Sequence, residues 1–105
     1  MAIADVQVNS SNYLTTHDDN GRRIAGTYLS SGEEYMGFGP DYYVTVNSSN
    51  YIQTYDENCR RIAGTYLSSG EVFKSCGGST ITTKNNSNYL QQYDKNLKRG
   101  SGRYA

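Results

Sequence analysis

The chain repeats itself, and the period constrains its fold more than any single residue does. The segment from Asn9 to Tyr13 returns as Asn47 to Tyr51, and in altered form it returns again 38 positions later, at Asn85 to Tyr89. The run from Arg22 to Glu33 recurs unchanged as Arg60 to Glu71. A fixed period of about 20–50 residues is typical of architectures in which each unit buries its apolar face against its neighbours. The sequence therefore predicts a repeat fold.

One copy of the repeat, residues 41–78, shows the pattern of a small sheet. β-branched and aromatic residues alternate with polar ones, and short clusters of Asn, Asp, Ser and Gly interrupt them, as in strands joined by turns. Helical periodicity is absent from the sequence pattern. The expected strands of this copy are residues 41–46, 51–55, 60–67 and 71–75. We therefore predict an all-β protein with four antiparallel strands per repeat.

The turn between the second and third strands is predicted to be a tight hairpin. In the first copy the sequence of this turn is Asp18-Asp19-Asn20-Gly21, and Asn-Gly suits a turn with positive φ. In the second copy Cys59 replaces the glycine. We expect Asn58 to adopt the positive φ there.

The predicted domain organisation is one all-β repeat domain over residues 1–105, with repeats at 3–40, 41–78 and 79–105. The strand order resembles a propeller blade, and a β-prism or a trefoil-like barrel are the alternatives. The third copy ends after its third strand, so we expect it to be truncated and to lack its outer strand.

Self-association is the second structural expectation. Known propeller rings run from about four blades upwards, so three units are too few, whereas two chains would supply six. The missing strand would also leave an unpaired edge, which invites pairing with another chain. The sequence therefore predicts a homo-oligomer.

The charge and the ends of the chain exclude several classes of protein. Ten basic and ten acidic side chains cancel, so the basic excess of a nucleic-acid-binding protein is missing. No apolar run approaches the ~20 residues of a membrane helix. The first residues resemble no secretion signal, so we expect a cytoplasmic protein in which Cys59 and Cys76 are free thiols.

Catalytic chemistry finds little support in the sequence. His17 is the single histidine, and the other copies carry Tyr55 and Tyr93 at its position. No nucleophile and orienting acid can be assigned to it. The glycine pairs lack the lysine of a phosphate loop, and no cluster has zinc or calcium spacing. We predict a protein without enzymatic activity, cofactor or metal.

Residues that recur in all three copies are the candidates for ligand binding. Carboxylate and guanidinium groups form paired hydrogen bonds with sugar hydroxyls, while a tyrosine ring covers the apolar face of a sugar. The candidate residues are Tyr13, Tyr51, Tyr89, Asp18, Asp56, Asp94, Arg23, Arg61 and Arg99. We therefore predict a non-catalytic binding or scaffold module with carbohydrate or protein as ligand. The alternative is a purely structural protein–protein assembly subunit.

Overall fold

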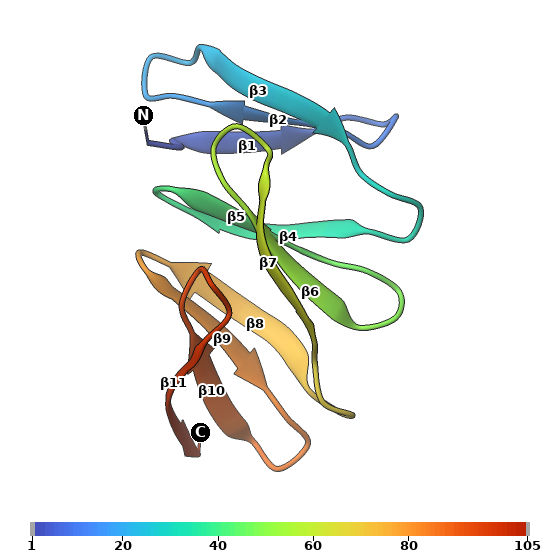
Figure 1. Ribbon diagram of the computed structural model, residues 1–105, viewed down its shortest axis with the longest axis vertical. Helices are drawn as coiled ribbons and strands as arrows, with labels where there is room; N and C mark the ends of the chain where they lie inside the picture. Colours follow the sequence, from blue (N-terminus) through green and yellow to red (C-terminus); the bar gives the residue numbers. More distant parts are fainter. Residues whose placement is uncertain (1, 105) are drawn as a thin grey trace.

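The computed structural model describes residues 2–104, and within that range it is all-β, with eleven antiparallel strands in three sheets. The sheets follow one another along the longest axis of a molecule that measures 41 × 27 × 19 Å (Figure 1). Sheet 1 has the order β1 (Asp5–Val8), β2 (Tyr13–His17) and β3 (Arg23–Tyr28). Sheet 2 has the order β4 (Glu34–Gly39), β5 (Tyr42–Val46), β6 (Tyr51–Tyr55) and β7 (Arg61–Tyr66). Sheet 3 has the order β8 (Val72–Gly77), β9 (Thr80–Lys84), β10 (Tyr89–Tyr93) and β11 (Arg99–Tyr104).

The expected strands of the middle copy are all present, but the last of them belongs to another sheet. The segment expected at residues 71–75 is β8, which pairs with β9 and so begins sheet 3. Likewise β4, at the end of the first copy, begins sheet 2. The third repeat, residues 79–105, contains only three strands, β9 to β11, but β8 of the second repeat completes sheet 3, and the sheet with three strands is sheet 1. The loops at 29–33 and 67–71 cross between sheets and do not close hairpins.

The recurring Asn-Ser-Ser-Asn-Tyr segment forms a turn whose residue types have a clear physical basis. The side chain of Asn47 accepts hydrogen bonds from the backbone N–H groups of Ser49 and Tyr51, at 2.9 and 3.1 Å. Asn50 has a φ of 62°, a left-handed conformation that asparagine tolerates better than most residues. The other two copies repeat these bonds, and the predicted turn is confirmed.

The acidic hairpin turn is also present, with one correction. Asp56 accepts hydrogen bonds from the backbone N–H groups of Asn58 and Arg60, both at 2.9 Å. The residue with positive φ is Cys59, at 64°, and not Asn58 as the sequence had suggested. Cys59 takes the position of Gly21, and its side chain packs against the cluster between sheets 1 and 2. That packing offsets the strain of a left-handed non-glycine residue.

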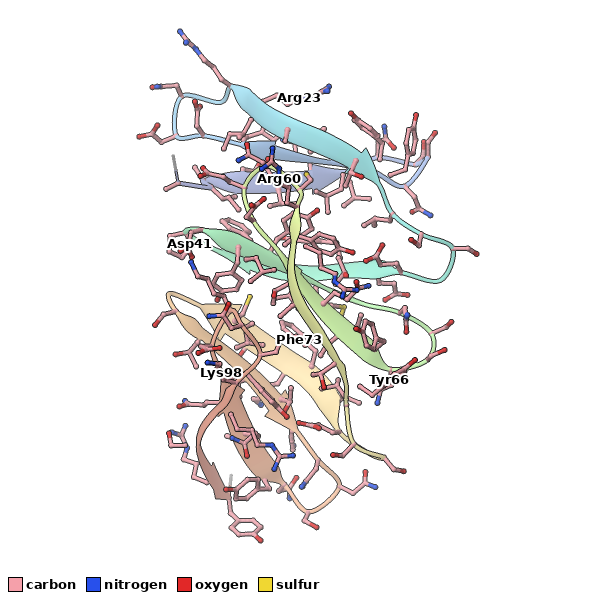
Figure 2. All side chains as sticks on the ribbon, viewed as in Figure 1. Arg23, Asp41, Arg60, Tyr66, Phe73 and Lys98 are labelled. Carbon is pink, nitrogen blue, oxygen red and sulfur yellow. The ribbon has the colours of Figure 1, made fainter. Side chains whose placement is uncertain are left out.

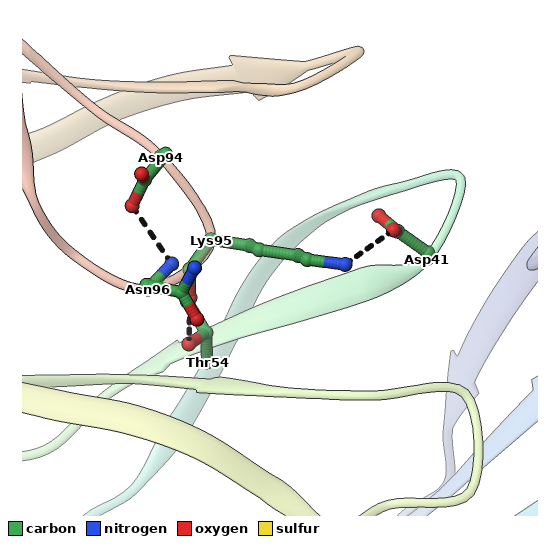
Figure 3. A network of polar contacts seen from close by, with 5 residues as sticks. All are labelled: Asp41, Thr54, Asp94, Lys95 and Asn96. Atoms are coloured by element: carbon green, nitrogen blue, oxygen red, sulfur yellow. Dashed lines mark hydrogen bonds and ion pairs between the residues drawn. The ribbon is translucent and has the colours of Figure 1, made fainter.

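Adjacent sheets are joined by apolar clusters and by the tips of hairpins. Phe73 lies between sheets 2 and 3, packed on a cluster that includes Ile52 and Ile81 (Figure 2). The tip of the β10–β11 hairpin reaches back to sheet 2, where the buried Thr54 hydroxyl donates to the carbonyl of Lys95 at 2.5 Å (Figure 3). The Lys95 ammonium also contacts Asp41, at 2.6 Å. Thr16 makes the equivalent bond to Glu57, so the same contact joins each pair of sheets.

The two outer faces of the stack carry polar residues where the inner faces carry apolar ones. On sheet 3, Thr82 stands at the position of the buried Val44, and Gln92 at that of Thr54. On sheet 1, Asp5 stands at the position of the buried Tyr43. The copies therefore differ most where a sheet has no neighbour among residues 2–104.

Candidate functional site

Each sheet carries a pair of tyrosines on its last hairpin, which is formed by β2 and β3, by β6 and β7, or by β10 and β11. The inner tyrosine begins the first strand of the hairpin, and the outer tyrosine ends the second strand. The rings meet edge-on, with centroids 4.7, 4.7 and 5.0 Å apart in sheets 1, 2 and 3. The pairs are Tyr13 with Tyr28, Tyr51 with Tyr66, and Tyr89 with Tyr104. The outer ring of each pair is 70%, 70% and 71% exposed, and Figure 2 shows Tyr66 at the margin of the molecule. Three similar aromatic surfaces thus recur along the stack.

A glycine lies beneath the inner ring of each pair. A Cβ added at Gly64 would overlap the hydroxyl and ring of Tyr51, and Gly26 and Gly102 stand in the same relation to their tyrosines. The ring therefore lies across the backbone of the outer strand. These glycines therefore mark a close approach of the tyrosine ring to the backbone.

The recurring arginines begin the strands that end in Tyr28, Tyr66 and Tyr104, and they differ in their partners. Arg23 donates to the Tyr13 hydroxyl at 3.1 Å, and its guanidinium carbon lies 5.5 Å from the centre of that ring. Arg61 donates to the side-chain oxygen of Gln53 at 3.5 Å. Arg99 lines a hollow of about 230 Å³ with Tyr89. We name each tyrosine pair, together with the arginine of the same hairpin, a Tyr–Tyr–Arg cluster.

The three candidate aspartates do not join these clusters. Asp18, Asp56 and Asp94 each use one carboxylate oxygen to accept two backbone N–H groups of the hairpin turn. The tyrosine begins the strand and the aspartate follows its end, five positions later. At about 3.3 Å per residue, the two lie roughly 16 Å apart along the strand. The structure therefore brings Arg23 against Tyr13 and Arg99 into one hollow with Tyr89, and it leaves the aspartates in the turns.

Two buried glutamates form a second recurring arrangement, which the sequence analysis did not single out. Glu71 is 5% exposed and accepts hydrogen bonds from the hydroxyls of Thr83 and Tyr93, at 2.5 and 2.8 Å. Glu33 accepts the same bonds from Thr45 and Tyr55 in sheet 2. The signal was available in the sequence, because both glutamates end the identical crossing loop.

The electrostatics of these buried groups follow from their partners. Burial disfavours the charge of Glu71, but the hydrogen bonds from Thr83, the Ser68 backbone and Tyr93 outweigh burial and hold its pKa below the ordinary value. Burial, with the hydrogen bond to Glu33, raises the pKa of Tyr55 to about 12. These carboxylates bind hydroxyl donors of their own sheet, so they fasten each crossing loop to the sheet that follows it.

Within residues 2–104, no three His, Cys, Asp or Glu side chains lie close enough together to hold a metal ion. The same residues include no helix of the length and hydropathy needed to cross a membrane. Cys59 and Cys76 are free thiols. Burial raises the pKa of both. His17 contacts the Thr15 hydroxyl at 2.8 Å.

No protein-family model and no curated protein sequence matches this chain. Among solved structures, BamB from Moraxella catarrhalis is similar, with a TM-score of 0.60 and 14% sequence identity. The match covers 94% of this chain, which spans only 32% of the BamB chain. BamB is a β-propeller. At this identity the likeness concerns the fold alone, and the fold of this chain resembles part of a β-propeller.

Proposed function

We propose that the protein is a non-catalytic binding module, that each sheet acts as a propeller blade, and that the three Tyr–Tyr–Arg clusters bind a repetitive ligand. One observation carries the proposal. Tyr28, Tyr66 and Tyr104 are at least 70% exposed, yet each ring is held against a second tyrosine in the same geometry. A large exposed ring that is already ordered loses little conformational entropy when a ligand covers it.

Carbohydrate is the ligand class that suits this chemistry best. A sugar presents one apolar face, which a tyrosine ring can cover, and a rim of hydroxyl groups. The neighbouring arginine and, in sheet 2, Gln53 supply donors and an acceptor for those hydroxyls. Each cluster is shallow, so single-site affinity is expected to be weak. Three clusters on one rigid stack would raise the overall affinity through multivalency.

A glycan array tests the proposal when wild type is compared with two triple variants. The first replaces Tyr28, Tyr66 and Tyr104 with alanine, and the second replaces the same three residues with phenylalanine. The phenylalanine variant keeps the rings and serves as the matched control. We expect binding in wild type and in the phenylalanine variant, and loss of binding in the alanine variant. Silence of the wild type across the array would exclude carbohydrate, and unchanged binding by the alanine variant would exclude these clusters.

A further inference from the structure

The free edge of β1 is the feature that distinguishes sheet 1 from the other two. Within the described chain β1 pairs with β2 alone, whereas β4 and β8 occupy the corresponding edge positions in sheets 2 and 3. The register places the backbone N–H and C=O groups of Val6 and Val8 on this edge, because Asn9 bonds to Tyr13 and ladder bonds alternate. Val44 and Val46 present the same groups to β4. An exposed edge of this kind is a template for another strand.

We propose that the edge of β1 binds an extended segment of another polypeptide as an added antiparallel strand, and that this segment carries a carboxylate followed four residues later by Gly or Ser. The proposal is independent of the proposed function, because the Tyr–Tyr–Arg clusters lie on the opposite edge of each sheet. The two strands that fill the same position elsewhere in the chain supply the pattern. Glu33 precedes Gly37 by four positions, and Glu71 precedes Ser75 by four.

The carboxylate of the added segment is inferred from the side chains of sheet 1 that stand where sheet 2 binds Glu33. In sheet 2, Glu33 is bound by Thr45 and Tyr55. The corresponding residues of sheet 1 are Gln7 and His17, an amide donor and an imidazole. The Gln7 amide now donates to Asp5 at 3.0 Å, in an exposed contact. Such a contact can be exchanged at small cost for one to an incoming carboxylate.

The small residue follows from the contact between neighbouring edge strands. β4 and β8 lie side by side, and a Cβ added at Gly37 would stand 2.8 Å from the sulfur of Cys76 and 3.6 Å from the ring of Phe73. A strand added to β1 would meet β4 as β4 meets β8. The residues that it would face are Tyr35 and Phe38, which stand at the positions of Phe73 and Cys76. Because these rings are larger than a thiol, the smallest residues, Gly above all, are expected opposite them.

A hollow lies beside this edge. It has a volume of about 280 Å³, and its lining combines three apolar or aromatic residues (Val8, Leu29 and Tyr35) with three polar ones (Asn12, Glu33 and Glu34). Val8 is 38% exposed and Tyr35 is half-buried. Apolar surface is therefore available to an added strand in addition to the backbone groups, as in other cases of strand addition.

The test uses a fluorescent peptide with the sequence of residues 29–40, LSSGEEYMGFGP, because this segment already fills the equivalent position in sheet 2. Its binding to the 105-residue protein is measured by fluorescence anisotropy. Three control peptides carry Glu33→Ala, Gly37→Leu, or N-methyl groups on the amides of Glu34 and Gly37. Each control is expected to bind at least about tenfold more weakly, the factor expected for one lost hydrogen bond to a charged group or its equivalent in steric clash.

Amide hydrogen exchange locates the bound peptide, with protection expected at Val6 and Val8 of the protein. The proposal is overturned if the parent peptide does not bind, if the N-methylated peptide binds equally well, or if protection appears elsewhere. It is also overturned if Val6 and Val8 are already protected in a dimer without peptide. That result would show that the edge pairs with a second copy of this chain.

Discussion

Removing the hydroxyl group of Tyr43 is expected to stabilise the protein. Tyr43 is fully buried between sheets 1 and 2, and its hydroxyl makes no hydrogen bond within the described residues. The polar group beside it is the thiol of Cys59, which is a weak donor and acceptor. The same position holds Ile81 in sheet 3, so the fold does not require a hydroxyl there. The Tyr43→Phe variant removes one oxygen and keeps the ring.

The magnitude follows from the cost of an unsatisfied buried polar group, which is about 1–3 kcal/mol. The thiol recovers part of that cost, so we expect a gain of about 1 kcal/mol in the free energy of unfolding. For a domain of this size such a gain raises Tm by roughly 4–8 °C.

Tyr55→Phe is the matched control. Its ring stacks on that of Tyr43 with centroids 5.0 Å apart, but its hydroxyl donates to the Glu33 carboxylate at 2.9 Å. A hydrogen bond to a charged group contributes about 1.5–3 kcal/mol, so this variant is expected to lose about 2 kcal/mol. Removal of the same atom from two stacked rings should thus have opposite effects.

Urea unfolding followed by circular dichroism measures both changes at constant m-value. The reasoning is refuted if Tyr43→Phe is less stable than wild type, or if both variants shift the midpoint in the same direction.

The remaining predictions concern the aromatic clusters and pH. Gly64→Ala should destabilise the protein by about 1–3 kcal/mol, because the new methyl group must displace the ring of Tyr51. Gly77→Ala in β8 is the control: its methyl group meets open space, so this variant should be neutral or slightly stabilising, and urea midpoints compare the two. Between about pH 10 and 12 wild type should lose stability, because burial raises the pKa of Tyr55 to about 12 in the fold and the residue ionises more easily when unfolded. Burial also raises the pKa of Tyr35, Tyr42, Tyr43 and Tyr93, so Tyr55→Phe should make this alkaline decline shallower without abolishing it, and an equal slope would contradict the assignment. The lowered pKa of Glu71 adds stability above its unfolded value of about 4.3, and this is lost as pH falls through the folded pKa; Glu71→Gln should therefore show a shallower decline on acidification, and an unchanged slope would count against that role.

The local structure could be predicted from the sequence because its signals are local. The alternation of residues 51–55 and the Asn-rich turn at 47–50 each depend on neighbouring positions, and both agree with the structure. The membership of β8 in sheet 3 could not be predicted in the same way. Pairing between strands is not local, and a Ser-Ser-Gly loop suits a hairpin as well as a crossing between sheets. The positive φ of Cys59 was also missed, because its side chain is packed by a neighbouring sheet that the sequence does not show.

Recurrence among the copies identified the candidate site but not the role of each residue. Tyr51 and Arg61 recur on the exposed outer hairpin, whereas Asp56 recurs because its carboxylate binds the turn. Glu71 was overlooked because a charged residue in a loop suggests solvent exposure, yet hydroxyl donors compensate its burial. Repetition in one chain reports equal surroundings, and both a binding site and a turn can provide them.

Self-association stays a prediction. A ring of two chains would place Thr82 and Gln92 of one copy against Asp5 and Gln7 of the other, and these side chains offer little apolar surface to bury. Sedimentation velocity decides whether the chain is a monomer or an oligomer in solution. A dimer would require another contact, such as the outer hairpins.

The polar substitutions on the outer faces also determine how such a stack can grow. Within residues 2–104 only the central sheet meets a neighbour on both sides, so residues 34–71 have the layout of an interior module. Extra copies of that module, inserted between sheets 1 and 3, would extend the stack without exposing apolar surface to water. The number of units in such a stack is thus an adjustable property.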